Sequence, residues 1–540
     1  MAAIVNTKPT SPLYPSRRSD VRAKNVVATS QPLAAQAGLD MLRAGGNAVD
    51  AALATAITLT VVEPSMNGIG SDAFAIVALG AGGGEAEGVY GFNGSGRSPA
   101  AWSPERFAGR SAMPAVGPDA VTVPGAVDAW LRLSERFGLL PFARLFEAAI
   151  GYAREGFPVS PIVAATWPLA ASLFEGRSEL SAFGETFLPG GRAPLAGEIF
   201  RCPAMAETLE AIAESRGESF YRGALAAKIA GEIQRLGGVM TEADLGGHEG
   251  EWVRCLKGAY AGSEIHEIPP NGQGIAALIA LGILDQLDIP GHAADSADCV
   301  HLQVEAMKLA FAEAHRHVGD PAAMQLPAGE LLDPGLHKRL AAGVRLDAAA
   351  FPEASVHPDR GTVYLCAADA SGMMVSFIQS NFLGFGSGVV VPGTGISLQN
   401  RARGFVLEPG HVNEVGGGKR PYHTIVPALA TRGGAPLMAF GVMGGHHQPQ
   451  GHVQVVTRIF DHGCSPQAAL DAPRWHVDED FGVHLEEGLA PIADELAARG
   501  QRVRVTGNPR LFGGGQVILR DGDAYVAGSD PRKDGQALGY

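Results

Sequence analysis

DRGTVYLCAAD, residues 359–369, is the stretch at which the character of the chain changes and from which its fold can be inferred. The alanine-rich and polar segment before it, which ends in the run from Val356 to Gly361, is predicted to be an exposed tether. From Thr362 onward, β-branched and aromatic residues predict a strand. A hydroxyl group at this junction is a candidate nucleophile that becomes a new N-terminus only when the bond between Gly361 and Thr362 is cut.

The chemical argument starts from the weakness of an unassisted hydroxyl group as a nucleophile. A threonine at the start of a chain can use its own α-amino group as the base, because the pKa of such an amine is about 7.7–8.0. One residue then supplies both the nucleophile and the base. The alternative, which this segment alone leaves open, is that Thr362 is an ordinary strand residue, since threonine is common in strands.

Paired apolar runs from Thr362 onward predict antiparallel strands. The pairs are residues 362–368 with 373–379, 424–430 with 438–443, and 517–519 with 524–526, each joined by a turn that contains glycine. Helical patterns follow at residues 453–460, after Ser465, and at residues 491–499. Strand pairs covered by helices predict layers of helices packed on sheets.

Helical signals dominate much of the chain before this stretch. Gln31–Arg43 has helical spacing and ends at a pair of glycines, which favour the end of a helix. Asn47 and Asp50 resemble a capping box that opens a second, buried helix. Residues 127–344 are predicted to be mainly helical.

Two other features of the first hundred residues are predicted to be extended. Residues 1–25 are polar and contain several prolines, which is typical of an extended arm. Residues 73–79 and 88–92 are short apolar segments that predict a hairpin with a glycine-rich tip at residues 81–84.

The composition is that of an ordinary globular protein. Of the 540 residues, 46% are hydrophobic and 18% charged, so the chain can bury a sizeable core. The net charge of −14 argues against nucleic acid or an anionic membrane surface as the main partner. The longest apolar run, residues 51–62, is too short to span a bilayer, and residues 1–18 lack the apolar core of a secretory signal. Five dispersed cysteines favour a reducing compartment, so a cytoplasmic location is expected.

Two segments carry residues that can complete a hydrolytic site around Thr362. Gly444 and Gly445 follow an apolar strand and can direct backbone N–H groups at a developing oxyanion, with a plain strand-to-helix turn as the alternative. Ser380 or Asn381, at the end of the strand predicted to pair with that of Thr362, can orient the hydroxyl group.

No metal, cofactor or nucleotide is expected. His446, His447 and His452 have no carboxylate or cysteine at the spacing found in zinc enzymes. The glycine-rich runs lack both the phosphate-loop pattern and the dinucleotide-binding pattern.

Many short blocks, taken in order, make the chain resemble the γ-glutamyltransferase (glutathione hydrolase) family of N-terminal nucleophile hydrolases. The blocks are residues 45–52, 62–64, 68–70, 123–127, 220–223, 236–241, 269–274, 305–311, 319–321, the Thr362 strand, 385–388, 419–421, 444–445 and 530–535. They cover nearly the whole chain, and many ordered blocks are far more specific than any one of them.

The resemblance implies an α+β fold, the four-layer αββα sandwich of these hydrolases, and self-cleavage of a precursor. Cleavage after Gly361 gives a large subunit, residues 1–361, and a small subunit, residues 362–540, which together form one αββα unit. A homodimer of such heterodimers is compatible with the family.

The resemblance also assigns roles within the site. Thr362 corresponds to the nucleophile, with its α-amine as the base. Gly444 and Gly445 correspond to the oxyanion-hole residues, and Ser380 to the hydroxyl that hydrogen-bonds the nucleophile.

The residues that hold the γ-glutamyl group in glutathione-acting members are different in this chain. Asn93 or Ser95 stands near the position of the arginine that binds the α-carboxylate, and Arg97 is close in sequence but out of register. The segment of Arg403 replaces the acid that binds the α-amine, and His423-Thr424 replace paired serines. Each lost charge-assisted hydrogen bond removes about 1.5–3 kcal/mol, so glutathione is not the expected substrate.

Other segments, residues 93–97, 376–380 and 385–390, resemble a subgroup that includes oxamate amidohydrolases. Extra cations such as Arg97, Arg403 and Arg420 suit a small anion that lacks an amine. We therefore expect a self-processing amidase for a small carboxylate-bearing amide. The candidate substrate-binding residues are Asn93, Arg97, Asn381, Arg403, His423 and Thr424.

Two alternative functions stay open at this point. One is a γ-glutamyl hydrolase or transferase with a rearranged clamp for the amino acid. The other is an uncleaved, non-catalytic homologue that serves as a binding protein.

Overall fold

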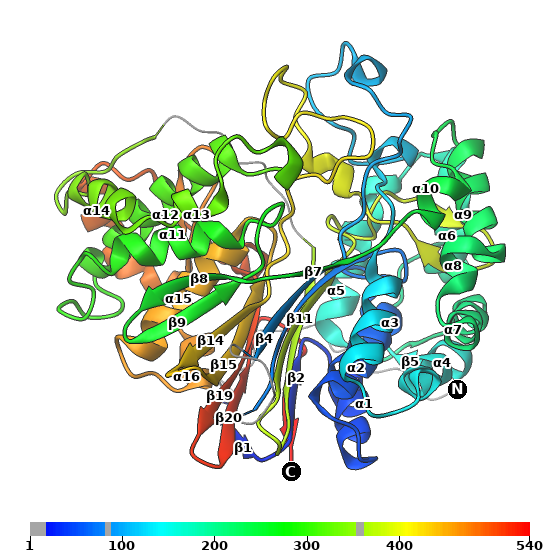
Figure 1. The fold of residues 1–540 in the computed structure, drawn as a ribbon, viewed down its shortest axis with the longest axis horizontal. Helices are drawn as coiled ribbons and strands as arrows, with labels where there is room; N and C mark the ends of the chain where they lie inside the picture. Colours follow the sequence, from blue (N-terminus) through cyan, green and yellow to red (C-terminus); the bar gives the residue numbers. More distant parts are fainter. Residues whose placement is uncertain (1–17, 81–87, 353–360) are drawn as a thin grey trace.

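Two seven-stranded sheets form the centre of the molecule, with helices on either side (Figure 1). The computed structural model describes residues 18–80, 88–352 and 361–540. We call the sheet that contains the C-terminal hairpin sheet I, and the sheet that contains the strand after Thr362 sheet II. Neighbouring strands run antiparallel throughout both sheets.

The strand order is β1-β20-β19-β15-β14-β9-β8 in sheet I and β21-β2-β10-β11-β3-β4-β7 in sheet II. The strands of sheet I are β1 (Val21–Ala23), β8 (Leu256–Tyr260), β9 (Ser263–Glu267), β14 (Ala428–Arg432), β15 (Ala435–Met443), β19 (Gly514–Asp521) and β20 (Ala524–Ser529). The strands of sheet II are β2 (Val26–Thr29), β3 (Asp72–Ala78), β4 (Val89–Asn93), β7 (Glu251–Val253), β10 (Val363–Ala368), β11 (Met374–Ser380) and β21 (Gln536–Gly539).

Strand β10 shows why the stretch after Thr362 determines the fold. It lies between β2 and β11, and all of its residues are buried. Val363 and Leu365 pack in the cluster that lies between sheet II and its helices, whereas Tyr364 and Cys366 pack in the cluster between the two sheets. Because successive side chains of a strand point to opposite faces, a strand covered on both sides must be apolar at every position.

Helices cover the outer face of each sheet (Figure 1). Those on sheet II are α1 (Pro32–Arg43), α2 (Ala48–Val62) and α3 (Ala126–Phe137). Those on sheet I are α11 (Gly274–Leu284), α15 (His447–Phe460) and α16 (Pro466–Asp471), with α12 (Ala297–His317) packed on α11. An apolar cluster with members from both sheets, including Phe74 and Ile518, fills the space between them.

The remaining elements lie around these layers. The helices are α4 (Glu147–Glu155), α5 (Pro161–Ala171), α6 (Ser181–Phe187), α7 (Pro203–Ser215), α8 (Glu218–Arg222), α9 (Ala224–Arg235), α10 (Glu242–Gly246), α13 (Ala328–Leu331), α14 (Pro334–Ala342) and α17 (Ala493–Ala498). The strands of the small sheets are β5 (Phe157–Pro158), β6 (Ile199–Phe200), β12 (Val390–Val391), β13 (Ile396–Ser397), β16 (Trp475–Val477), β17 (Val483–Leu485) and β18 (Val503–Val505).

Most of the predicted helix caps and strand pairs are confirmed. Gln31 caps α1, and Asn47 with Asp50 forms the capping box of α2. The three predicted pairs after residue 361 are β10–β11, β14–β15 and β19–β20. The earlier pair is β3–β4; its predicted glycine-rich tip, residues 81–84, lies outside the described residues, as does the end of the predicted tether before Gly361.

Two predictions were incomplete. The region 127–344 is mainly helical as predicted, from α3 to α14, but it also contains the strands β5 to β9. Strands β7 and β8 are short, partly exposed and at sheet edges, so they lack the clean apolar alternation that signals a strand. Within the predicted arm, Val21–Ala23 forms β1 on the edge of sheet I, whereas residues 1–17 lie outside the described residues.

None of the helices in the described ranges combines the length and the apolar content that crossing a bilayer requires.

Candidate active site

Thr362 lies at the start of β10, where the pairing with β11 brings it beside Ser380. Its side chain is buried, and its Oγ1 donates to Ser380 Oγ at 3.2 Å and lies against the carbonyl oxygen of Gly361. The Nε2 of Gln448, near the start of α15, donates to Thr362 Oγ1 at 3.3 Å. The hydroxyl group is therefore held between two polar side chains and the carbonyl of the bond that precedes it.

Ser380 links the hydroxyl of Thr362 to the same carbonyl. Its Oγ donates to the oxygen of Gly361 at 2.7 Å and accepts from the backbone N–H of Phe382 at 2.8 Å. The serine is thereby fixed at the end of β11 and can donate to negative charge that develops on the Gly361 carbonyl.

Gly361 occupies a position that only glycine fits. Its φ is +142°, and a Cβ atom there would lie 2.2 Å from the carbonyl oxygen of Phe382 and 3.0 Å from the nitrogen of Gly384. Because both contacts are to backbone, they cannot be relieved by turning a side chain.

Gly444 and Gly445 form the turn between β15 and α15. Their φ values of +127° and +58° favour glycine. Their carbonyl oxygens accept from the first amides of α15, His447 N at 3.0 Å and Gln448 N at 3.1 Å. The positive end of this helix therefore lies beside the two glycines, which suits an oxyanion.

Gln273, directly before α11, ties this turn to another predicted segment. Its Nε2 donates to the carbonyl oxygen of Thr424 at 2.6 Å and to that of Gly445 at 2.9 Å. One side chain thus sets the spacing between the glycine turn and the segment before β14.

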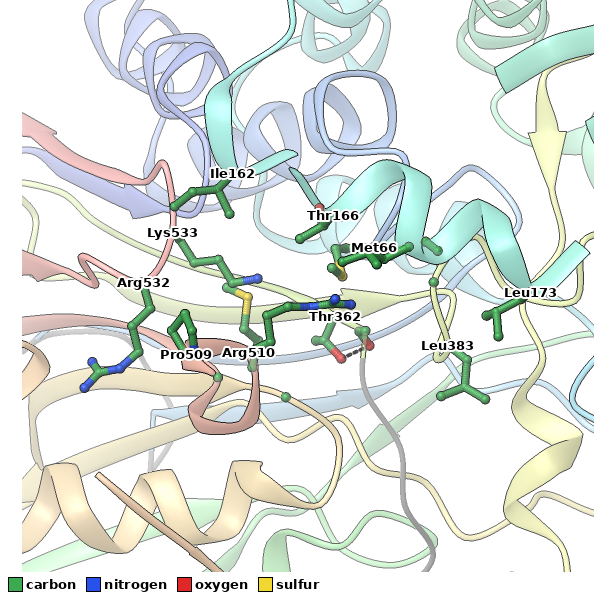
Figure 2. Close-up of a pocket in the computed structure, with 17 residues that line it drawn as sticks. Met66, Ile162, Thr166, Leu173, Thr362, Leu383, Pro509, Arg510, Arg532 and Lys533 are labelled. Atoms are coloured by element: carbon green, nitrogen blue, oxygen red, sulfur yellow. Dashed lines mark hydrogen bonds between the residues drawn. The ribbon is translucent and has the colours of Figure 1, made fainter. Parts of the chain in front are cut away.

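A pocket of about 240 Å³ opens beside Thr362 (Figure 2). Gly361, Thr362 and Gly444 line it together with apolar side chains such as Met66 and Leu383. Its remaining wall carries cationic residues from the C-terminal part of the chain, Arg510, Arg532 and Lys533.

Two of the predicted polar residues, Asn381 and Asn93, lie in buried networks. Asn381 accepts from Ser71 Oγ at 2.8 Å and donates to Ser397 Oγ at 3.0 Å. Asn93 donates to Asn271 Oδ1 at 3.0 Å. None of these side chains lines the Thr362 pocket.

His423 and Thr424 lie in a second buried network. His423 Nε2 is 3.1 Å from Asp72 Oδ2, and Thr424 Oγ1 accepts from Arg401 at 2.8 Å. Burial raises the pKa of Asp72 to about 7, although the nearby Arg401 lowers it. Burial also lowers the pKa of His423 well below its ordinary value, with Arg401 and Arg420 acting in the same direction. Both shifts favour the uncharged forms of the pair.

The cations predicted to bind a small anion already have partners elsewhere. Arg97 forms salt bridges of 3.0 Å with Asp320 and 3.4 Å with Glu251, and Arg420 forms one of 2.7 Å with Glu251. Arg403 donates to the carbonyl oxygen of Met113 at 2.9 Å, and like Arg97 it lies outside the lining of the Thr362 pocket.

Comparison with known proteins identifies the family. The family model of gamma-glutamyltranspeptidase matches residues 34–540. The chain belongs to this family.

The chain is also similar to individual members and to a solved acylase. It is 36% identical to the "glutathione hydrolase-like YwrD proenzyme" of Bacillus subtilis and 36% identical to the "oxamate amidohydrolase proenzyme" of Klebsiella pneumoniae, in each case over 97% of this chain and 99% of the relative. A crystal structure of a cephalosporin acylase from Bacillus halodurans superimposes with a TM-score of 0.93, at 46% identity and 99% coverage of both chains. The predicted family is confirmed, and the chain is an enzyme of the hydrolase and acyltransferase type.

Sequence reasoning missed two residues of this gamma-glutamyltranspeptidase site. Gln448 follows the Gly-Gly-His-His run, which was considered for its glycines and histidines, and Gln273 lies in the Pro-Pro-Asn-Gly-Gln-Gly block, which was recognised only as a family block. A buried glutamine next to a tight turn was the available signal, because its amide must find partners.

Proposed function

We propose that this member of the gamma-glutamyltranspeptidase family is a self-processing amidohydrolase with Thr362 as its nucleophile. Cleavage after Gly361 would give residues 1–361 and 362–540, which stay together as one four-layer αββα unit of the N-terminal nucleophile hydrolase type. The observation that carries the proposal is the contact of Thr362 Oγ1 with the carbonyl of Gly361, beside Ser380 and Gln448.

The same contacts support a route for the self-cleavage. Thr362 Oγ1 attacks the carbonyl carbon of Gly361, the C–N bond breaks as its nitrogen takes a proton, and an ester links the two residues. Water then hydrolyses the ester, which leaves a carboxylate on Gly361 and a free α-amine on Thr362. Ser380, which donates to the Gly361 oxygen at 2.7 Å, stabilises the charge that this oxygen gains during the attack.

The mature enzyme would use the same hydroxyl on an external amide. The α-amine of Thr362 takes the proton of the hydroxyl, and the oxygen attacks the amide carbon. The N–H groups of Gly444 and Gly445 hold the oxyanion at the positive end of α15. The amine leaves with a proton, and water releases the acid from the acyl-enzyme.

We propose a small carboxylate-bearing amide as the substrate, of which oxamate is the simplest example. The similarity to an oxamate amidohydrolase over nearly the whole chain supports this choice. So does the replacement of the paired serines of glutathione-acting members by His423 and Thr424, whose side chains are occupied by Asp72 and Arg401. A γ-glutamyl hydrolase or transferase is the second candidate, supported by the 36% identity to the glutathione hydrolase-like relative.

Two measurements test the proposal. A denaturing gel of the purified protein should show two bands, with the smaller one starting at Thr362; a single full-length band would favour the uncleaved binding protein. Steady-state hydrolysis of oxamate should then exceed that of γ-glutamyl-p-nitroanilide, and the reverse order would favour the γ-glutamyl enzyme.

A further inference from the structure

The Thr362 pocket has one cationic and one apolar wall. The cationic wall consists of Arg510, Arg532 and Lys533, all from the last part of the chain. The rest of the lining is mainly apolar and includes Met66, Ile162, Leu173 and Leu383. Figure 2 shows Arg510 and Lys533 directed toward the part of the pocket that holds Thr362.

Only part of this positive charge is neutralised by the described residues. Arg532 forms salt bridges with Glu486 and Asp530, so its charge is neutralised. Within the described ranges, no carboxylate lies in salt-bridge range of Arg510 or Lys533.

Two carboxyl groups, those of Asp534 and Glu63, could neutralise Lys533, but both already accept hydrogen bonds from other residues. Asp534 accepts from the backbone N–H groups of Ile162 and Val163 at the start of α5, at 2.9 and 3.1 Å. Burial raises the pKa of the Glu63 carboxyl group although the positive charge of Lys533 lowers it, and this group accepts a hydrogen bond from Ser30. Two cations beside the proposed nucleophile therefore remain available to an anionic ligand.

We infer that Arg510 and Lys533 bind the carboxylate of the amide substrate, and that this carboxylate is carried on a short apolar chain. The inference rests on the proposed function. The planar guanidinium of arginine matches a carboxylate with two parallel hydrogen bonds, and lysine adds a compact second charge. The apolar wall favours methylene groups between that carboxylate and the scissile carbonyl at Thr362. The substrate class is then a dicarboxylic monoamide longer than oxamate, or an amide whose leaving amine carries the acid.

Pairs of substrates in which a methyl group replaces the carboxylate test this assignment. One pair is glutaramate, with its acid on the acyl side, and pentanamide; the other is N-butanoyl-β-alanine, with its acid on the leaving amine, and N-propylbutanamide. For the preferred probe, Arg510→Gln and Lys533→Gln should each lower the ratio of its kcat/KM to that of its neutral partner about tenfold, the loss of one charge-assisted hydrogen bond. The probe that shows the loss identifies the side that bears the acid.

Controls separate a binding role from a general effect. Arg510→Lys should recover part of the ratio, because it keeps the charge without the planar fork. Arg504→Gln removes an exposed arginine outside the pocket lining and should leave the ratio unchanged. Equal losses on charged and neutral amides, or no loss on either, would overturn the assignment.

A binding measurement distinguishes failure of this inference from failure of the proposed function. If the processed enzyme hydrolyses neither oxamate nor any of these amides, the proposed function is wrong, and calorimetric titration with glutarate then tests the two cations directly. Glutarate binding that weakens about tenfold in Arg510→Gln upholds the carboxylate site. Binding that is absent in the wild type, or equal in wild type and variant, contradicts it.

Discussion

The two ends of the chain that flank the proposed cut are held in different ways. Downstream, Thr362 is held by a hydroxyl, an amide and a carbonyl in an open pocket. Upstream, Ala350 is held by a buried ion pair: its N–H donates to Glu305 at 2.8 Å, and its carbonyl accepts from Lys308 at 3.1 Å. Glu305 and Lys308 are 3.0 Å apart and almost completely buried on α12.

The ion pair of Glu305 and Lys308, which we call the anchor, also contacts residues downstream of the proposed cut. Gln501, from the segment proposed as the small subunit, accepts from Lys308 at 2.7 Å and donates to Glu305 at 2.8 Å. The N–H of Ala349 donates to the carbonyl of Arg499 at 2.7 Å. The comparison teaches that the reactive end is held by hydrogen bonds between neutral groups, whereas the upstream segment is held by charge. Changes at the first end should alter rates, and changes at the second should alter stability.

The largest effect is expected at the reactive end. Thr362→Ala should abolish self-cleavage completely, because no hydroxyl remains to attack the Gly361 carbonyl. A denaturing gel after prolonged incubation gives the readout, with Thr362→Ser, which keeps a hydroxyl, as the matched control. Two bands from the alanine variant would show that another nucleophile or a protease makes the cut.

The next largest effect is expected at the anchor. Glu305→Gln leaves Lys308 charged and buried without its counter-ion, which should destabilise the protein by about 3–5 kcal/mol. Denaturant unfolding of the processed protein measures this, and the exposed Glu330→Gln on α13 is the control. A normal unfolding midpoint would show that the anchor contributes little and would remove the contrast between the two ends.

A smaller effect is expected immediately before the cut. Gly361→Ala introduces a Cβ against the backbone of Phe382 and Gly384 at a positive φ, a strain of about 1–3 kcal/mol. Self-cleavage should slow about tenfold or more, followed as the loss of the full-length band over time. Gly329→Ala, where a Cβ meets nothing within 4 Å, should process at the normal rate. Unchanged processing of Gly361→Ala would mean that the backbone of Phe382 and Gly384 moves away from residue 361 before the reaction.

The smallest effect is expected for the contact that spans the cut. Gln501→Ala removes hydrogen bonds to Glu305 and Lys308 but leaves the ion pair itself, so a loss of about 1–2 kcal/mol is expected. Thermal unfolding compared with the exposed Gln286→Ala reports it. A loss of stability as large as that of Glu305→Gln would show that the hydrogen bonds of Gln501, and not the ion pair, contribute most of the stability of the anchor.

Sequence alone predicted those parts of the molecule that depend on local patterns. The capping box at Asn47 and the hairpin of β10 and β11 follow from short-range preferences, and both are present. Strand pairing with a short turn predicted Ser380 or Asn381 beside Thr362, and in the structure it is Ser380 that contacts the hydroxyl group. Strands β8 and β9 were missed because the pairing of β9 with β14, which adds this hairpin to sheet I, is set by distant residues.

The substrate-binding prediction depended on cations whose partners sequence does not reveal. Arg97 is separated by more than two hundred residues from Asp320, which neutralises it. Arg510 lies in no recognised block, and Lys533 lies in the block 530–535 but was given no role; their position beside Thr362 follows from the packing of the C-terminal segment against α5. Charge in a sequence identifies a binding group only after its salt bridges are known.

The central position of β10 has a practical consequence for anyone who labels this protein. Most new chain ends made by proteolysis are frayed and lie at the surface. The end proposed here would begin a strand that is hydrogen-bonded on both edges and covered on both faces. An amine-directed acylating reagent that modifies the mature Thr362 would therefore count active sites and not protein ends, and the yield of that reaction would measure the fraction of molecules that have matured.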